Sequence, residues 1–244
     1  MRKYQLIKVD TSAIFVSDTH LSEDSPSVID NFNNFLRNHA NNHDFLFILG
    51  DLFEYWIGDD AKQFNSVVTT LQKLKTKIYF IPGNRDFLIG SQFLDKTKIT
   101  LLEDPTLIQL GNHKVIILHG DTLCIDDNDY QEYRAKVRSN DWKKEFLNKG
   151  MDERLKICKD LRKKSTEAQK TKNDILMDVN ENAVEKLFKE FDFPPLMIHG
   201  HTHRPKKHDY IFKNHVCKRW VLNDWYDSGS FLVWENNHLY EQIL

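Results

Sequence analysis

The chain has 244 residues, of which 40% are hydrophobic and 29% are charged, and its formal net charge is −2. These proportions are typical of a soluble globular protein and exclude collagen-like, coiled-coil and largely disordered chains. The length suits one large domain with a sizeable core, so we expect a single domain over residues 1–244.

The cysteines and the N-terminus give two further expectations. Cys124, Cys158 and Cys217 are widely spaced and include no Cys-x-x-Cys pair, which argues against a disulfide framework and against a zinc–thiolate site. The first residues are positively charged but lack the apolar segment of a signal peptide, and no stretch is long enough to span a bilayer. We therefore expect three small buried thiols in a cytoplasmic protein.

The first half of the chain alternates between strand-like and helix-like patterns. Short apolar runs followed by turn residues predict strands at residues 12–17, 45–49 and 77–81. Apolar residues at helical spacing predict one helix from Ser27 to about Asn41 and another around residues 67–74. This alternation indicates a largely parallel sheet.

The second half is richer in strands. Three are predicted at residues 106–110, 114–118 and 196–198, with a hairpin turn at Gly111-Asn112. The last part of the chain contains four more strand-like runs, at residues 210–212, 219–222, 230–234 and 238–243. Because these leave no room for crossover helices, we expect them to pair antiparallel in a second sheet. The predicted fold class is α/β, with two facing β-sheets flanked by helices.

A helical insertion is predicted over residues 128–192. This segment contains no proline and one glycine, and its apolar residues recur at roughly helical spacing. Residues 130–172 carry 14 Lys and Arg against 7 Asp and Glu, or +7, which leaves −9 on the rest of the chain. We expect this basic insertion to arch over the site that the neighbouring motifs form.

Five short motifs each end an apolar, strand-like run with Asp, Asn or His. They are Ser17-Asp18-Thr19-His20, Gly50-Asp51, Gly83-Asn84-Arg85-Asp86, His119-Gly120-Asp121 and Gly200-His201-Thr202-His203. In open α/β sheets the loops beyond the carboxyl ends of the strands converge, and ligands bind there. The same context five times over argues against packing alone.

The residue types in these motifs are those of a metal site. Asp18 and His20 are two residues apart, so both can point at one ion if the loop turns. The Asp51 carboxylate can bridge two cations, and Asn84 offers a neutral carbonyl oxygen. Three further imidazoles come from His119, His201 and His203. Mixed nitrogen and oxygen ligands suit Mn²⁺, Fe²⁺ or Zn²⁺ better than Ca²⁺ or Mg²⁺.

Three other polar residues lie beside the motifs. His199 is expected to pack next to the site rather than to coordinate an ion. Asp86 and Asp121 are open to two interpretations, as acceptors that orient the ligand imidazoles or as capping and turn residues.

The order of these motifs resembles that of the calcineurin-like metallophosphoesterases, over residues 18–203. The resemblance implies two divalent metal ions with Asp51 between them. It also implies a catalytic centre that contains Asp51, Asn84, Arg85 and His119. By that pattern the first ion is held by Asp18, His20 and His203, and the second by Asn84, His119 and His201. Two such ions can activate a water molecule and stabilise both ends of an in-line displacement. The implied chemistry is phosphate-ester hydrolysis.

One position departs from the superfamily pattern. The motif usually reads Gly-Asn-His followed by Asp or Glu, but this chain has Arg85 in place of the histidine. An arginine cannot act as a general acid near neutral pH, although its planar fork suits bidentate phosphate binding. The exchange removes one assumed catalytic role and favours a diphosphate substrate.

Longer stretches are similar to the UDP-2,3-diacylglucosamine pyrophosphohydrolases of the lipid A pathway, and the match runs through nearly the whole chain. They are residues 50–60, 83–86, 119–127, 177–180 and 223–230. This resemblance implies water attack on the α-phosphorus of UDP-2,3-diacylglucosamine, giving UMP and 2,3-diacylglucosamine 1-phosphate. It also implies a preference for Mn²⁺ and peripheral association with the cytoplasmic face of the inner membrane of a Gram-negative bacterium.

The same resemblance implies a set of substrate-binding residues, several of them in the insertion. They are Asn84, Arg85, Asp127, Arg162, Ser165, Gln169, Lys172 and His201. A basic amphipathic insertion would suit both acyl chains and a diphosphate. For the residues of the insertion, a solvated helix face is the competing interpretation.

Two alternative functions stay open. One is a metallophosphodiesterase that acts on nucleotides or DNA, but the acidic balance outside the insertion argues against nucleic acid. The other is a non-catalytic scaffold with a phosphoesterase fold, which should have lost metal ligands that this chain retains. The sequence leaves the oligomeric state and the acyl-chain preference open.

Overall fold

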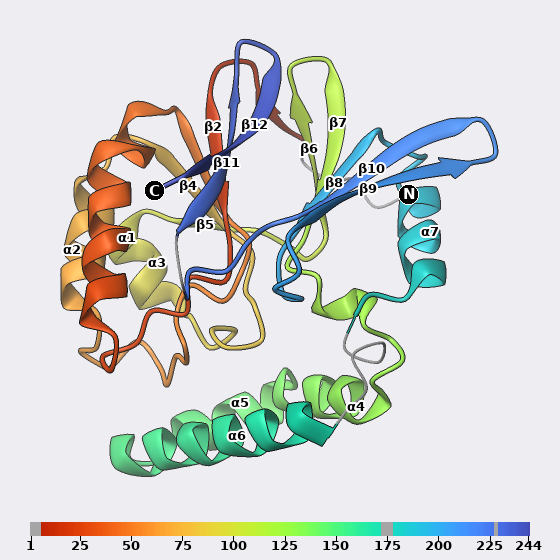
Figure 1. Cartoon of the computed structure of the whole chain (residues 1–244). Coiled ribbons are helices and arrows are strands. Elements are labelled where there is room, and N and C mark those ends of the chain that lie inside the picture. Colours follow the sequence, from red (N-terminus) through yellow and green to blue (C-terminus); the bar gives the residue numbers. More distant parts are fainter. Residues whose placement is uncertain (1–5, 172–177, 227–228) are drawn as a thin grey trace.

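Two six-stranded sheets pack face to face in the computed structural model of the chain, with helices on both outer faces (Figure 1). The structure describes residues 6–171, 178–226 and 229–244. The first sheet has the order β1-β6-β7-β8-β10-β9, with bounds Ile7–Val9, Thr106–Leu110, His113–Ile117, Leu196–His199, His215–Val221 and Lys206–Phe212. The second has the order β12-β11-β2-β3-β4-β5, with bounds His238–Ile243, Ser230–Glu235, Ala13–Val16, Phe45–Ile48, Lys77–Phe80 and Thr100–Leu101. The predicted pair of facing sheets is confirmed.

The second sheet is buried on both faces, which is why its central strands are apolar without interruption. In β2, Ile14 and Val16 point to the outer face, whereas Phe15 points to the other sheet and stacks on Phe47 with ring centroids 5.0 Å apart. Helices α1 (Pro26–Asn38), α2 (Asn65–Lys73) and α3 (Ser91–Thr97) lie on this outer side (Figure 1). The parallel pairing of β2, β3 and β4 follows from the helices that connect them.

The outer face of the first sheet is covered by helix α7 (Glu181–Glu190). Asn180 caps this helix by accepting from the backbone N–H groups of residues 182 and 183. Val184 and Phe188 are fully buried in one cluster with Ile116 and Met197 of the sheet. The molecule therefore has four layers, helix on sheet on sheet on helix.

The prediction that the last four strands form one second sheet is wrong. They pair as two antiparallel hairpins, but β9 and β10 extend the first sheet, whereas β11 and β12 extend the second. Strand β10 is joined to β8 in parallel, and β11 is joined to β2 antiparallel. Local alternation predicts a hairpin but does not say which sheet edge it joins, because that depends on distant strands.

Three helices stand apart from the sheets, below the carboxyl ends of the central strands (Figure 1). They are α4 (Asn128–Val137), α5 (Asn140–Leu147) and α6 (Met151–Thr171), and we call them the lid. The lid contacts the body through Trp142, Phe146 and Ile157, which pack against the apolar cluster beneath the second sheet. That residues 128–192 form one inserted unit stays a prediction. Helix α7, the last helix of this segment, packs on the first sheet.

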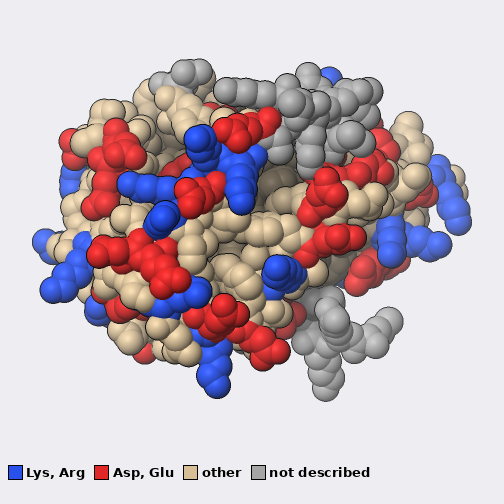
Figure 2. Space-filling model, turned by 90° about the horizontal axis from the view of Figure 1, so that it is seen from below, with Lys and Arg blue, Asp and Glu red and all other residues tan. Residues whose placement is uncertain are grey.

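The charges of the lid do not form a continuous basic field. Seen from below, blue and red side chains are interspersed over the described part of this face (Figure 2). Within the described ranges, no helix is both long enough and apolar enough to cross a membrane.

Candidate metal centre

The five motifs follow β2, β3, β4, β7 and β8, so the chain brings them to one edge of the two sheets. Backbone hydrogen bonds tie the loops to one another, from Asp18 N to Gly50 O at 3.1 Å, His20 N to Asp51 O at 3.0 Å and Gly200 N to His119 O at 2.9 Å. The last of these joins the first sheet's two ligand loops, and the others join two loops of the second sheet. The side chains therefore converge from both sheets.

Two glycines allow the loops to approach this closely. A Cβ atom at Gly83 would lie 2.1 Å from Asp51 Oδ1, and one at Gly200 would lie 2.1 Å from Asp18 Oδ2. Both contacts are shorter than any side chain tolerates, so only glycine fits beside these carboxylates.

The backbone is strained at most of the candidate ligands. Five of them have positive φ angles, namely Asp18 at 52°, His20 at 45°, Asp51 at 52°, His201 at 70° and His203 at 52°. For residues other than glycine this conformation costs on the order of 1 kcal/mol or more each, and it persists only where the surroundings impose it. Such strain is concentrated at functional sites.

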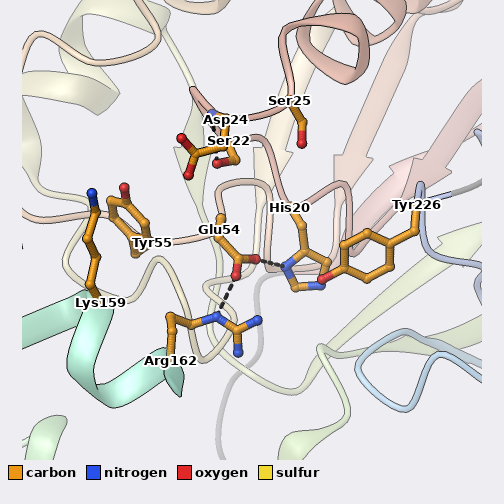
Figure 3. A pocket seen from close by; sticks show the side chains of 9 residues that line it. All are labelled: His20, Ser22, Asp24, Ser25, Glu54, Tyr55, Lys159, Arg162 and Tyr226. Carbon is orange, nitrogen blue, oxygen red and sulfur yellow. Dashed lines mark hydrogen bonds and ion pairs between the residues drawn. The ribbon is translucent and has the colours of Figure 1, made fainter. Parts of the chain in front are cut away.

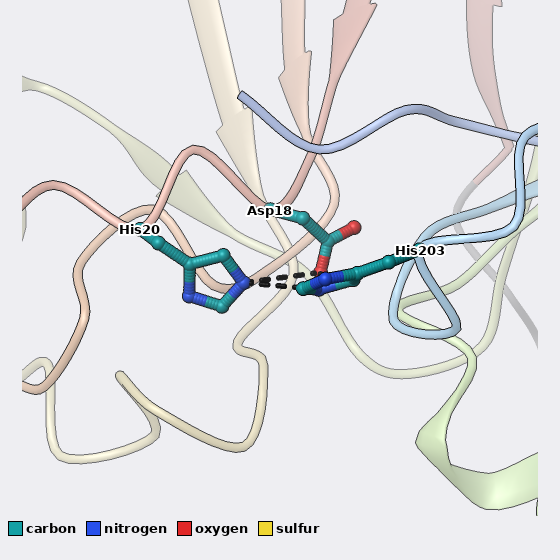
Figure 4. Close-up of side chains that lie close together, drawn as sticks. All are labelled: Asp18, His20 and His203. Atoms are coloured by element: carbon teal, nitrogen blue, oxygen red, sulfur yellow. Dashed lines mark hydrogen bonds and ion pairs between the residues drawn. The ribbon is translucent and has the colours of Figure 1, made fainter. Parts of the chain in front are cut away.

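Asp18, His20 and His203 form one group of converging ligand atoms (Figure 4). The Nε2 atoms of the two histidines lie 3.1 Å apart, and Asp18 Oδ1 lies 3.4 Å from His203 Nε2. Asp18 Oδ2 accepts from Ser17 Oγ at 2.5 Å and from the backbone N–H of residue 201 at 2.9 Å, whereas Oδ1 is buried and has no hydrogen-bond partner among the described residues. One carboxylate oxygen is anchored, and the other is directed at the group's centre.

A carboxylate faces the second ring nitrogen of each histidine. His20 Nδ1 lies 3.2 Å from Glu54 Oε2, and His203 Nδ1 lies 3.3 Å from Asp224 Oδ2. A carboxylate in this place favours the proton on Nδ1 of a neutral ring. The two Nε2 atoms, 3.1 Å apart, would then be available as ligands for one cation.

A second group surrounds Asp51. His119 Nδ1 donates to the carbonyl oxygen of Leu49 at 2.9 Å, which leaves its Nε2 as an acceptor that lies 3.0 Å from Asn84 Oδ1 and 3.7 Å from Asp51 Oδ1. Asn84 Oδ1 is also 3.0 Å from His201 Nδ1. With the opposite amide orientation, the Asn84 NH₂ group would donate to both rings. A cation requires the carbonyl orientation, because only an oxygen atom of the amide can act as its ligand.

The donor set and its field fit divalent cations. Metal–nitrogen distances of about 2.1 Å place neighbouring ligand atoms roughly 3–3.5 Å apart. The shortest spacing in the first group, 3.1 Å, and in the second, 3.0 Å, are of that size. Burial alone would lower the pKa of His119, but the charges of nearby carboxylates, first Asp51, outweigh it and raise the pKa to about 9. In the same way the surrounding imidazoles hold the pKa of the buried Asp18 carboxyl well below its usual range. A field that stabilises a proton on His119 also stabilises a metal ion there.

Arg85 lies at the edge of these groups. Its backbone N–H donates to Asp51 Oδ1 at 2.9 Å, and its side chain reaches Glu54 Oε1 with Nη1 at 3.3 Å. Glu54 also accepts from Arg162 Nε of helix α6, so one carboxylate joins a candidate ligand, His20, to two arginines. Burial would raise the pKa of Glu54, but the contacts with His20 and the two guanidinium groups outweigh it and lower the pKa to about 2.

Comparison with known proteins gives one consistent answer. Residues 12–205 match the model of the calcineurin-like phosphoesterase family. A protein of Aromatoleum aromaticum named UDP-2,3-diacylglucosamine hydrolase is 43% identical over 92% of this chain and 93% of its own length. Proteins of the same name from Aliivibrio fischeri (44% identical, 91% and 94% covered) and Coxiella burnetii (41% identical, 93% and 95% covered) are similar to the same extent.

The chain belongs to the UDP-2,3-diacylglucosamine hydrolase family of calcineurin-like phosphoesterases. It is a metal-dependent hydrolase. Among solved structures, an archaeal phosphodiesterase aligns with 96% of this chain and 99% of its own, at 13% identity and a TM-score of 0.47.

The substrate residues implied by the resemblance are spread over this hydrolase. Asp127 caps α4 by accepting from Tyr130 N at 3.1 Å. Ser165 is exposed on α6, one turn after Arg162, and the Gln169 side chain and Lys172 lie outside the described residues. The structure thus brings Asn84, Arg85, Arg162 and His201 towards the centre and leaves Ser165 on the solvent side of the lid.

The three polar residues beside the motifs have contacts that clarify their roles. His199 is fully buried and bonds Gly200 O at 2.8 Å and Arg219 at 3.1 Å, beside the centre as expected. Asp86 accepts from the backbone N–H groups of Leu52 and Gly83, which is a turn role. Asp121 accepts from Tyr130 Oη and Arg134 Nε, so among the described residues these hydrogen bonds join it to the lid rather than to an imidazole.

Sequence reasoning assigned no role to Glu54 or Asp224, although both lie in stretches that resemble the family. Each faces the Nδ1 atom of a candidate ligand histidine. Their positions, three residues after Asp51 and next to Trp225, carry no spacing signal of their own. Carboxylates that orient ligand imidazoles are nevertheless a general feature of metal sites, and that rule could have prompted the search.

Proposed function

We propose that this hydrolase cleaves the diphosphate of UDP-2,3-diacylglucosamine to UMP and 2,3-diacylglucosamine 1-phosphate, as a step of lipid A biosynthesis. Two observations together carry the proposal. Two groups of possible ligand atoms lie close together, one from Asp18, His20 and His203 and one from Asp18, Asp51 and His119. Relatives named UDP-2,3-diacylglucosamine hydrolase are 38–44% identical to the chain over about nine-tenths of its length. A scaffold without activity would have no reason to retain strained, buried ligands.

Asp18, His20 and His203 would hold one divalent ion, Asn84, His119 and His201 would hold the other, and Asp51 would lie between them. When bound, these ions would supply a water nucleophile at neutral pH and Lewis-acid stabilisation of the phosphoryl oxygens. We propose Mn²⁺ as the ion because the ligands mix imidazole with carboxylate and amide oxygen.

The protein's own groups would position the diphosphate. Arg85 lies 3.7 Å from Asp51 Oδ2 through Nε, so its guanidinium fork stands where a phosphate next to the ions would lie. Arg162 enters from the lid beside it, and Asp127, Ser165, Gln169 and Lys172 would complete the substrate contacts. Water would attack the α-phosphorus, and the sugar 1-phosphate would leave.

We also propose where the reaction takes place. The whole of residues 1–244 would act as one catalytic domain, with the insertion at residues 128–192 selecting the lipid. Its substrate carries two acyl chains, so the protein would work at the cytoplasmic face of the inner membrane as a peripheral protein.

The proposal can be tested with three substrates. Purified protein in Mn²⁺ is incubated with UDP-2,3-diacylglucosamine, with a nucleotide diester and with single-stranded DNA, and a metal-free sample serves as the control. We expect UMP to be released from UDP-2,3-diacylglucosamine much faster than the diester or the DNA is cleaved, and only with metal present. Cleavage of the diester or the DNA alone would favour another phosphodiesterase, and no cleavage of any substrate would favour a scaffold.

A further inference from the structure

A cavity of about 380 Å³ opens beside the first ligand group, between the loop after β2, the segment after β3, helix α6 and the loop before β11 (Figure 3). Small-molecule pockets typically measure roughly 300–1,000 Å³, so this one could hold a ligand of modest size. His20 lines the cavity with its ring, and the cavity therefore begins where the candidate metal ligands end.

The chemistry of the lining is polar and aromatic. Among the described residues no aliphatic side chain lines the cavity. Hydroxyl and carboxylate groups come from Ser22, Asp24 and Ser25, and positive charge comes from Lys159 and Arg162 of α6. An acyl chain would gain little here because it would displace water from polar groups without replacing their hydrogen bonds.

An aromatic platform forms one side. The Tyr226 ring stacks on the His20 ring, with centroids 5.4 Å apart and planes 5° from parallel (Figure 3). Tyr226 is also 57% exposed, so its ring is accessible to a ligand. A flat, accessible ring next to hydroxyl and carboxylate groups is the arrangement that binds a nucleobase and its ribose.

The cavity lies next to the first ligand group, a position that suits the nucleotide half of the proposed substrate. Arg162 binds Glu54, and Glu54 faces His20, so the cationic wall of the cavity is fixed next to the first ligand group. A phosphate held at that group would project its ester substituent into the space between Tyr226 and α6.

From these observations we infer that the cavity binds the nucleoside of the uridine nucleotide, with the base against Tyr226 and the ribose hydroxyls near Asp24 and Ser22. The inference rests on the proposed function, because it takes the UMP half of that substrate as its ligand. The acyl chains then leave the centre in another direction, away from this polar space.

The test compares inhibition by UMP with inhibition by ribose 5-phosphate, which has the same phosphate and sugar but no base. Inhibition is measured on the full-length protein in Mn²⁺, with a small chromogenic phosphodiester as the substrate. Because that assay does not use the lipid, it can succeed even if the proposed substrate is wrong. We expect UMP to bind at least about fivefold more tightly than ribose 5-phosphate, as one base stacked on an aromatic ring allows.

The decisive variants change the ring. Tyr226→Ala should reduce the preference for UMP over ribose 5-phosphate to about onefold, whereas Tyr226→Phe should retain it, because the ring rather than the hydroxyl makes the stack. Tyr240→Ala, which removes a 40% exposed tyrosine on β12, is the matched control and should retain it too. If Tyr226→Ala weakens both inhibitors equally, the ring acts only by supporting His20 and the inference is wrong. Equal binding of the two inhibitors to the unmodified protein would also overturn it.

Discussion

The strand-end loops of the metal centre and the helices of the lid differ in what holds their functional side chains. In the loops, backbone hydrogen bonds, glycine contacts and strained φ angles fix Asp18, Asp51 and His201 within the buried edge of two sheets. In the lid, long side chains make the polar contacts with the body. The comparison suggests that the rigid part carries the reaction and that the part held by side chains selects the substrate.

Four arginines of the lid make polar contacts with the body. They are Arg134 with Asp121, Arg138 with the carbonyl of Gly83, Arg154 with Asp60 and the carbonyl of Ile57, and Arg162 with Glu54. Arg134 and Arg138 end on residues of the metal-centre motifs, and Arg162 ends on Glu54, which faces the candidate ligand His20. The lid is therefore connected to the centre as well as to the surface.

Removing the proposed bridging carboxylate should have the largest effect. Asp51→Ala is expected to lower the rate of hydrolysis by about 10³-fold or more with every substrate, because both ions would lose a shared ligand. The measurement is the rate together with the metal content of the purified variant. Near-normal turnover would contradict the two-metal account and with it the idea that the body carries the reaction.

A pair of glycine substitutions sharpens the comparison between the two regions. Gly200→Ala would push a methyl group against Asp18 Oδ2, and we expect about 10²-fold slower hydrolysis with reduced metal content, since small displacements of reacting groups are costly. Gly150→Ala in the lid is the matched control, because a Cβ atom there has no neighbour within 4 Å. If the two variants behave alike, the loops are less rigid than the contacts indicate.

Replacing Arg85 is expected to slow hydrolysis of the substrate without changing the metal content. Losing a hydrogen bond to a charged group costs about 1.5–3 kcal/mol, so Arg85→Ala should slow hydrolysis of the lipid substrate by roughly 10- to 100-fold. Metal content should stay nearly unchanged, and Arg85→Lys should recover only part of the rate because it lacks the planar fork. A variant that loses metal would mean that Arg85 holds the centre together.

The smallest effect on hydrolysis is expected from a substitution in the lid. Arg154 is 3% exposed and binds Asp60 and the Ile57 carbonyl, so Arg154→Met should loosen the lid without changing the ligands. We expect faster limited proteolysis within α5 and α6 and a several-fold loss of lipid hydrolysis, with the small phosphodiester cleaved at the original rate. An equal loss on both substrates would show that the lid supports the reaction and not only its selectivity.

The sequence could predict the elements and the ligand types because both depend on local pattern. The apolar run at Phe45–Ile48 is buried on both faces, and the polar residue that follows it has to leave the sheet at its edge. The same reasoning located the other strands that end in motifs. It could not assign β9 and β10 to one sheet and β11 and β12 to the other, since local pattern does not say that β10 pairs with β8 and that β11 pairs with β2 at the other end of the chain.

The sequence also could not predict the finer structure of the site. No propensity predicts that Asp51 and His203 adopt left-handed backbone angles, because those angles are imposed by the crossing loops. The orienting contacts of Glu54 and Asp224 join residues that are distant in the chain, at separations that no motif fixes. Tyr226 is a further case, since an isolated tyrosine gives no sign that it will stack on a ligand histidine.

The position of the oxygen that enters from water tests the central claim most directly. UDP-2,3-diacylglucosamine is hydrolysed by the purified protein with Mn²⁺ in water labelled with oxygen-18, and both products are analysed by mass spectrometry. Attack on the α-phosphorus at the metal centre predicts one labelled oxygen in UMP and none in 2,3-diacylglucosamine 1-phosphate. Label in the sugar phosphate, or no metal-dependent hydrolysis at all, would contradict the account.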